Sequence, residues 1–376
     1  MVVTGTDAER IATELVERLR APDLRIAFVF ADWQLDPPTI ARVTHRGLSP
    51  ASVVGGTTIG VVASRPAPAT ARAGTFAAAG LGLYGDWVKA GVGVAPELPR
   101  SPLTRSRDAV EQAAAELGTS APLLDPARHV GITVVGRCDD HEEAFCIGSA
   151  ATAPQIRVIG GCASTELQST RPSYVYVRGE ALAEAGVVIL LDSELPFCAV
   201  TSAHLLPTEV KTVVTNTSGR VITELDGRPA APRLHALVAQ LGDTLDLPRP
   251  TRYAFARYVD GVPYVRSIRH IDGDQIVLAS SVETGHVLRL MRSGDLLGTT
   301  RRDLAAAGER VGGTMVALLV MSCTIRHWEA TARGIERELD EIYAAYPTIG
   351  YQSFGEQSGM LLVNHTLTGL AIGARR

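Results

Sequence analysis

Apolar residues near the start of the chain follow a helical spacing and then a strand spacing. Ile11 and Leu15 lie on one face of a charged segment, which predicts an amphipathic N-terminal helix within residues 1–22. Compact, β-branched apolar runs at 25–32 and 51–64 are typical of strands. The spacing therefore predicts helices and strands that alternate along the chain, as in an α/β domain.

The strand pattern then repeats at a fixed interval. The apolar run at 130–135 follows the run at 25–30 by 105 residues, and Gly160-Gly161 follow Gly55-Gly56 by the same 105. Self-similarity at one interval indicates a repeated structural unit. We therefore expect an internal duplication of an α/β unit, with copies at 23–120 and 128–246 that share one core.

The last third of the chain has a different pattern. A proline-broken segment around 247–253 predicts a domain boundary. Three short runs joined by glycine-containing turns, at 264–271, 275–282 and 286–292, predict an antiparallel meander. A longer periodic segment at 326–346 predicts one long amphipathic helix.

Together these patterns predict a mixed α/β and α+β fold in three parts. An N-terminal helix occupies residues 1–22, and an internally duplicated α/β domain with mixed sheets occupies 23–246. A C-terminal α+β domain with the antiparallel meander occupies 250–376.

Composition narrows the function. The formal net charge is −4 over 376 residues, with no basic footprint of the kind that nucleic-acid binding requires. The five cysteines show no zinc-ligand spacing, so we expect them to be reduced and packed. No signal-peptide pattern and no apolar run long enough to span a membrane is present, which favours a cytoplasmic protein without membrane contact.

Common catalytic motifs are missing from the sequence. It contains neither a phosphate-binding GxxxxGK[ST] loop nor a GxGxxG turn between a strand and a helix. It also has no GxSxG elbow and no HExxH zinc motif. Whether the protein is an enzyme stays open at this point.

Several short segments spread over the chain do match a known pattern. They are the strand that ends in Gly160-Gly161, the strand at 180–191, Glu224-Leu225-Asp226-Gly227-Arg228-Pro229-Ala230, Val265-Arg266, Ser322-Cys323 with Arg326, Gly355-Glu356 and Asn364-His365-Thr366. On these segments the chain resembles FIST proteins, a family of sensory domains found with bacterial signalling partners. The resemblance spans nearly the whole chain and implies a small-molecule or gas ligand and a separate signalling protein as partner.

Some FIST proteins are described as haem-binding nitric oxide sensors, which makes His204 a candidate. It ends a predicted strand shortly before Pro207, and a neutral imidazole on an apolar wall is what axial haem ligation requires. We predict His204 as the metal ligand, with Gly160, Gly161 and Cys162 as further cofactor-binding residues. The alternatives are a hydrogen-bonded histidine beside a turn and a packed cysteine.

A second candidate site lies where an apolar strand enters a helix. Cys323 and Arg326 are positioned there, and helix N-termini favour anions. Glu356 is expected to pair with Arg326 or to take a ligand's amino group, and Tyr351 completes the predicted ligand-binding set. The alternative is a structural Arg–Glu pair that ties helix to sheet.

Three functional hypotheses follow. The first is a haem-binding sensor of a diatomic gas such as nitric oxide. The second is a haem-dependent biosynthetic enzyme with oxidative or nitrogen-transfer chemistry, and the third is an amino-acid sensor without a cofactor. The helix at 326–346 either packs on its own sheet or forms a homodimer.

Overall fold

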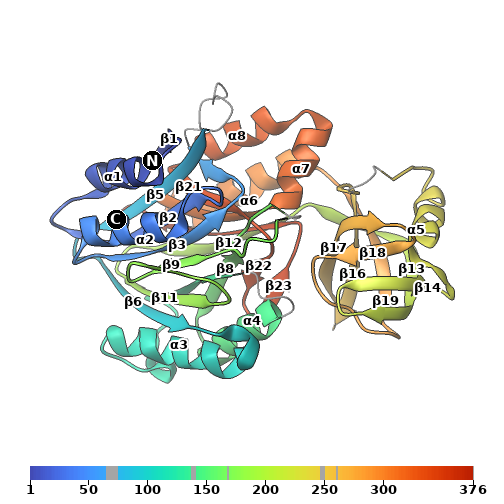
Figure 1. Cartoon of the computed structure of the whole chain (residues 1–376), viewed down its shortest axis with the longest axis horizontal. Helices are drawn as coiled ribbons and strands as arrows, with labels where there is room; N and C mark the ends of the chain where they lie inside the picture. Colours follow the sequence, from blue (N-terminus) through green and yellow to red (C-terminus); the bar gives the residue numbers. More distant parts are fainter. Residues whose placement is uncertain (65–74, 137–140, 167–168, 246–249, 260, 376) are drawn as a thin grey trace.

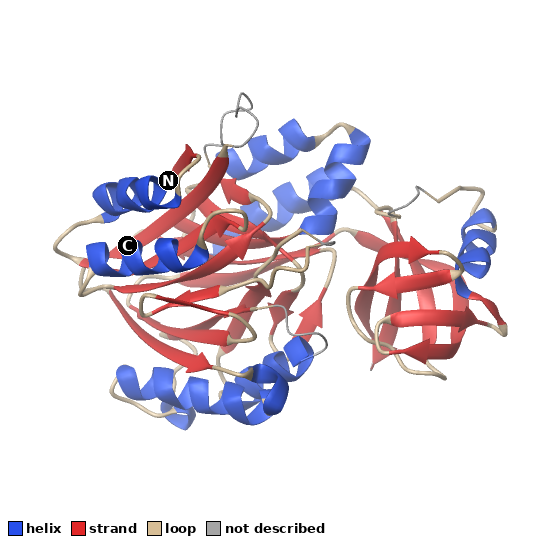
Figure 2. Ribbon diagram, in the orientation of Figure 1, coloured by secondary structure: helices blue, strands red, loops and turns tan. Residues whose placement is uncertain are grey.

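The computed structural model describes residues 1–64, 75–136, 141–166, 169–245, 250–259 and 261–375. The chain forms two bodies: a large one built from three sheets with helices outside them, and a small barrel that stands to one side (Figures 1 and 2). The predicted mixed α/β architecture is therefore confirmed. In the described part of the chain, no helix is both long enough and apolar enough to cross a membrane.

The first unit of the large body holds the predicted N-terminal helix. Its elements are β1 (Val2–Gly5), α1 (Ala8–Leu19), β2 (Leu24–Asp32), α2 (Pro37–Leu48), β3 (Ser52–Thr58), β4 (Val61–Ala63) and β5 (Phe76–Tyr84). Strand β2 pairs in parallel with β3 and antiparallel with β5, and β1 extends the sheet beyond β5. The sequence analysis missed α2, whose prolines occupy the first helical turn, where their missing N–H costs nothing.

The second and third units repeat this order. The second contains β6 (Val88–Ala95), α3 (Pro102–Glu116), β7 (His129–Val135), α4 (His141–Thr152), β8 (Arg157–Cys162), β9 (Val175–Val177), β10 (Glu180–Leu182) and β11 (Gly186–Ser193). Short 3-10 turns, η1 (Leu98–Arg100) and η2 (Ala121–Leu123), flank α3. The third contains β12 (Phe197–Ala203), α6 (Leu296–Arg310), β20 (Met315–Cys323), α7 (Thr324–Arg333), α8 (Glu336–Ala344), β21 (Thr348–Ser353), β22 (Glu356–Ser358), β23 (Leu361–Val363) and β24 (Thr366–Gly373).

One glycine in each unit shows that the three units are equivalent. Gly55, Gly160 and Gly350 each lie on the second strand of the parallel pair. A Cβ at these positions would lie 1.7, 2.4 and 1.8 Å from the carbonyl oxygen of the paired residue on the first strand. Only glycine allows this close approach of two backbones. The duplication predicted from the 105-residue interval is therefore present, and a third copy exists. The predicted bounds of 23–120 and 128–246 are wrong, because β6 pairs with β11 of the second unit and β12 pairs with β24 of the third.

The third copy escaped the sequence analysis because the barrel interrupts it. From Gly160 to Gly350 the interval is 350 − 160 = 190 residues, longer than the first by 85. Barrel strands run from Leu205 to Ser293, between β12 and α6 of the third unit. A self-similarity search at one fixed interval cannot find a unit that is divided in this way.

The three units also exchange strands in a ring. Strand β4 of the first unit pairs with β21 of the third, β22 of the third pairs with β8 of the second, and β9 of the second pairs with β3 of the first. Each sheet thus contains a strand from another unit. This pairing joins the three sheets into one body. That body contains strands from both sides of the predicted domain boundary at 246/250.

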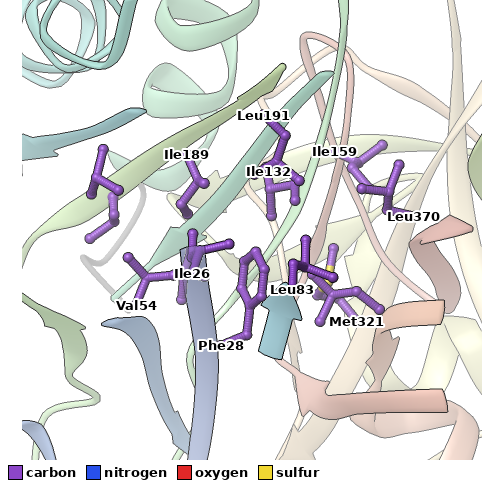
Figure 3. Close-up of a cluster of buried hydrophobic side chains, with 14 of the residues drawn as sticks. Ile26, Phe28, Val54, Leu83, Ile132, Ile159, Ile189, Leu191, Met321 and Leu370 are labelled. Atoms are coloured by element: carbon purple, nitrogen blue, oxygen red, sulfur yellow. The ribbon is translucent and has the colours of Figure 1, made fainter. Parts of the chain in front are cut away.

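The inner faces of the three sheets meet in one apolar core (Figure 3). Phe28 comes from the first unit, Ile132 from the second and Met321 from the third, and Figure 3 shows them close together. Tyr351 is fully buried in the same core and stacks on Phe30 with a centroid distance of 4.3 Å. The helices cover the outer faces of the sheets (Figure 2).

The barrel is a closed antiparallel sheet. Its elements are β13 (Leu205–Ser218), β14 (Val221–Leu225), β15 (Arg228–Pro229), α5 (Ala230–Ala239), β16 (Tyr253–Val259), β17 (Val262–Asp272), β18 (Gln275–Leu278) and β19 (Val287–Ser293). The strands follow the order β13-β19-β16-β17-β18-β14, and a β13–β14 pairing closes the ring. Helix α5 packs on the barrel core through Leu234 and Val238.

Two predictions about the C-terminal part need correction. The expected boundary around 247–253 falls inside the barrel, because β13 and β14 precede it and pair with β19 and β18, which follow it. Residues 246–249 of this segment lie outside the described residues. The expected long helix at 326–346 is two helices, because Gly334 adopts a left-handed conformation (φ +66°) and ends α7.

Candidate ligand-binding site

A small pocket lies where the parallel strands β20 and β21 of the third unit end against the barrel. Cys323 and Ser353 are the last paired residues of these strands, and α7 begins directly after Cys323. Ligands of open α/β sheets bind at this carboxyl end of parallel strands. The lining residues are Arg220, Arg269 and Ala279 from the barrel and Cys323, Thr324, Ile325, Trp328, Ser353, Phe354 and Asn364 from the third unit.

The pocket is narrow and its surface is mostly apolar. Its volume is about 30 Å³, which is room for about two water-sized groups. Trp328, Phe354 and Ile325 supply large apolar surfaces. A site of this kind holds a few ligand atoms firmly and leaves the rest of a larger ligand at its mouth.

Asn364 lines the pocket and carries a buried hydrogen-bond donor without a partner. Its Oδ1 accepts a hydrogen bond of 2.8 Å from the Ser280 hydroxyl of the barrel, and the residue is fully buried. Its Nδ2 has no partner. A Cβ at Gly355 would lie 3.4 Å from this nitrogen, so the glycine keeps the adjacent space open. Buried donors without a partner are rare and costly, which suggests a function for this one.

A neutral acid lies behind the pocket. Glu356 accepts hydrogen bonds of 2.6 Å from the Ser353 hydroxyl and 2.7 Å from the Thr366 hydroxyl. Burial without a basic partner raises the pKa of Glu356 from 4.5 to about 8, and these hydrogen bonds only partly offset it. The same burial raises the pKa of the neighbouring Cys323 thiol well above its usual value. Cys323 is therefore a protonated thiol, not an activated thiolate.

Arginines bring positive charge from the barrel side. Arg220 lines the pocket and also binds Glu142 at the start of α4, at 2.8 Å. Arg266 lies 3.4 Å from the neighbouring Glu143. Glu142 and Glu143 thus lie in the first turn of α4 and also pair with barrel arginines.

His204 belongs to a different buried cluster. Its Nε2 donates to Glu329 at 2.8 Å, and its Nδ1 accepts from the Arg326 guanidinium at 3.4 Å. Burial lowers the pKa of His204, while the pKa of Glu329 falls to about 2 because its hydrogen bonds from His204 and Ser293 outweigh burial. The ring is therefore neutral and both of its nitrogens are occupied.

This geometry does not fit His204 as an axial haem ligand. Ligation needs a free ring nitrogen that faces a cavity, and neither nitrogen is free. The His204 side chain is fully buried, and the pocket of Asn364 does not include it. Within the described ranges, no group of three histidine, cysteine or acidic side chains is placed to hold a metal ion.

The other predicted cofactor-binding residues lie in the core of the large body. Gly160 and Gly161 are packed against Thr133 and Met321, and a Cβ on either glycine would overlap those residues. Cys162 is buried in a second apolar cluster, and burial raises the pKa of its thiol well above the usual value. Cys162 is therefore packed in the core, as the alternative interpretation expected.

The four predicted ligand-binding residues are divided among three places. Cys323 lines the pocket and Glu356 lies directly behind it. Tyr351 is in the core, where its hydroxyl donates to the Gly161 carbonyl at 2.7 Å. Arg326 donates to Thr300 at 2.6 Å and joins the His204 cluster, so the predicted Arg326–Glu356 pair does not form.

The sequence analysis did not single out the pocket's central residue. Asn364 stood in a matching segment, but nothing in the sequence showed that Ser280, 84 residues earlier, would occupy one end of its amide. Phe354 and Ser353 gave no chemical signal either. Trp328 lines the same pocket as Cys323 because α7 begins directly after β20.

Comparisons with known proteins identify the family but not the ligand. No curated protein matches the chain. Among solved structures, cyanuric acid hydrolase from A. caulinodans matches with 10% identity over 100% of both chains and a TM-score of 0.36. A chorismatase matches with 12% identity over 93% of both chains and a TM-score of 0.31. Similarity this weak supports no conclusion about activity.

Family models cover most of the sequence. The model for the FIST N domain matches residues 25–228, and the model for the FIST C domain matches residues 230–359. The border between them lies in the barrel, just before α5. FIST domains are small-ligand-binding sensory domains. The chain belongs to the FIST family.

Proposed function

We propose that this protein is a small-ligand receptor whose ligand binds in the pocket between the barrel and the third unit. The observation that carries the proposal is the unpaired, fully buried Nδ2 of Asn364 in the pocket wall. An unsatisfied donor costs about 1–3 kcal/mol in a folded protein, and a ligand acceptor removes that cost.

The position of the pocket suits a receptor. Both bodies contribute to its wall, since Arg269 and Ala279 belong to the barrel and Trp328 to the third unit. A ligand there touches both bodies at once, and its binding free energy favours the arrangement of the bodies that closes the pocket. This is a direct way to report ligand binding to the outside of the molecule.

Haem-based sensing of nitric oxide stays a prediction and has its own test. The closed hydrogen bonding of His204 favours a structural role for this histidine. An absorption spectrum after haem titration decides the matter. A Soret band that is lost in His204→Ala, with folding retained, would restore the haem hypothesis over the receptor proposed here.

The receptor proposal is tested by blocking the pocket. Ala279→Phe fills it from the barrel side, and Leu241→Phe at a separate hollow of the barrel is the matched control. A panel of small acids, amides, amines and alcohols is screened by thermal shift and by tryptophan fluorescence, since Trp328 lines the pocket. Compounds that bind the wild type and Leu241→Phe but not Ala279→Phe are expected. Binding that is equal in all three proteins would contradict the proposal.

A further inference from the structure

We infer that the ligand of this pocket is a small carboxylate without an ammonium group, bound with its carboxylate at Asn364 Nδ2 and its apolar part on Trp328 and Phe354. The inference rests on the proposed function and names the ligand class for it. It departs from an amino-acid ligand, the class expected from the Arg326 and Glu356 pair.

The polar side of the pocket favours an anion. Asn364 offers a buried N–H donor with no partner, so the ligand group that meets it must be an acceptor. Arg269 and Arg220 bring guanidinium groups to the wall, the charge of Arg220 being offset by its ion pair with Glu142, and α7 begins there with the partial positive charge of its first turn. A carboxylate oxygen satisfies all three features, and a neutral carbonyl satisfies only the first.

The same wall disfavours an ammonium group. None of the described lining residues is an aspartate or glutamate. Two acids lie behind the wall: Glu142 is held by Arg220 at 2.8 Å, and Glu356 accepts from Ser353 and Thr366 while burial raises its pKa to about 8. An α-ammonium group would therefore meet guanidinium groups and no carboxylate in the pocket lining, which costs binding free energy.

The remaining surface favours an apolar body of modest size. The exposed lining is mostly apolar and includes Trp328, Phe354, Ile325 and Ala279. Their surface repays the burial of methyl groups or of an aromatic ring. Branched aliphatic acids and aryl-alkanoic acids combine these two requirements.

Matched compounds separate charge from shape. 3-Methylbutanoate is compared with valine, which adds the α-ammonium group, and with 3-methylbutanamide, which removes the charge. 3-Phenylpropanoate, phenylalanine and 3-phenylpropanamide form a second set. Affinities are measured by titration calorimetry on the full chain.

One variant exchanges the donor alone. Asn364→Asp replaces the free NH₂ by an oxygen and keeps the acceptor that Ser280 uses. Asn216→Asp makes the same change at an exposed position of the barrel and is the control. Thermal unfolding verifies that both variants fold, and Ala279→Phe serves as a second pocket variant that does not alter Asn364.

We expect the wild type and Asn216→Asp to bind at least one carboxylate about tenfold more tightly than its amino acid and its amide, and Asn364→Asp to lose at least tenfold. An amino acid that binds as tightly as its matched carboxylate in a manner sensitive to Ala279→Phe would overturn the inference and leave the receptor proposal standing. Carboxylate binding that Asn364→Asp does not weaken would also overturn it. If none of the six compounds binds, the inference fails, and the blocked-pocket screen alone decides the proposed function.

Discussion

Two buried polar clusters lie side by side in the third unit near the barrel, and the hydrogen bonds of His204 and Asn364 at their centres differ. In the His204 cluster, both ring nitrogens and both carboxylate oxygens of Glu329 are hydrogen-bonded. In the Asn364 cluster, the carboxamide uses its oxygen and leaves its nitrogen without a partner. The two clusters are close to each other: the ring of His204 lies 5.8 Å from the ring of His365, the residue that follows Asn364.

This difference in hydrogen bonding suggests different roles for the two clusters. The His204–Glu329 contact is complete without a ligand, so it serves best as a tie between elements, although the Nε of Arg326 in the same cluster has no partner among the described residues. The His204 cluster connects α7 to the end of β12 and, through Ser293, to the end of β19, where the chain enters and leaves the barrel. The Asn364 cluster is complete only with something in the pocket. In the receptor that we propose, His204 has a structural role and Asn364 binds the ligand.

The largest expected effect is on the His204–Glu329 contact. Glu329→Ala removes the acceptor of His204, Ser293 and Arg333 and leaves the buried Nε2–H of His204 without a partner. Because two buried donors each lose their acceptor at about 1–3 kcal/mol, we expect a loss of about 2–5 kcal/mol in the free energy of unfolding, measured by urea denaturation. Glu338→Ala, at an exposed position of α8, is the control and should change it by less than about 0.5 kcal/mol. A loss below about 1 kcal/mol for Glu329→Ala would mean that the network is not a tie.

The next effect is a pH dependence that belongs to the pocket cluster. The pKa of Glu356 in the folded protein is about 8, above its usual 4.5, because burial disfavours the charged form. Its contribution to stability is therefore complete below pH 4.5 and is lost as the pH rises toward 8. Glu356→Gln keeps a neutral side chain at every pH, so its stability relative to the wild type should rise across this window.

Urea denaturation of both proteins at several pH values measures this difference. The gain of Glu356→Gln at high pH is expected to be on the order of a few kcal/mol. A stability difference that stays constant from pH 5 to pH 8 would contradict the buried neutral acid.

A smaller effect concerns the residue that positions the binding donor. Ser280→Ala removes the hydrogen bond that fixes the Asn364 carboxamide but leaves the donor itself. We expect the affinity for a bound carboxylate to fall by about 1 kcal/mol, or roughly fivefold, in titration calorimetry. Ser281→Ala on the adjacent residue is the control. Equal affinities for Ser280→Ala and the wild type would show that the amide is held by packing alone.

The smallest effect is a difference in reactivity among cysteines. Cys323 lines the pocket, whereas Cys146 and Cys162 are packed inside an apolar cluster. A small thiol reagent such as methyl methanethiosulfonate should modify Cys323 slowly, because its thiol is protonated, and should leave the other two intact in the folded protein. Peptide mass mapping over time measures this. Modification of Cys162 before Cys323 would contradict the proposed access.

The sequence predicted what depends on local periodicity and on repeated patterns. Strands around Gly55 and Gly160, the helix at 103–117 and the equivalence of two units follow from spacing that neighbouring residues set themselves. The third unit was missed because an inserted barrel breaks its interval. The helix break at Gly334 was missed because the apolar stripe continues past this residue. The helical backbone ends there, since Gly334 has a positive φ.

The positions of site residues could be predicted only where they depend on neighbouring residues in the sequence. Cys323 was placed correctly at a strand-to-helix junction, because the pattern of β20 and α7 is visible in the sequence. The hydrogen bonds of His204 and Asn364 could not be predicted from sequence, since they depend on partners far along the chain: Glu329 for His204 and Ser280 for Asn364. Residue type suggests what a side chain can bind, and only the fold shows whether it is already bound.

The most direct measurement is a crystal structure of the wild-type protein soaked with 3-methylbutanoate. The account predicts density for the acid in the pocket between barrel and third unit, with one carboxylate oxygen about 2.9 Å from Asn364 Nδ2. The His204–Glu329 contact should stay unchanged in the same crystal. Density for the acid at the His204 cluster, or an Asn364 carboxamide that points away from a bound acid, would contradict it.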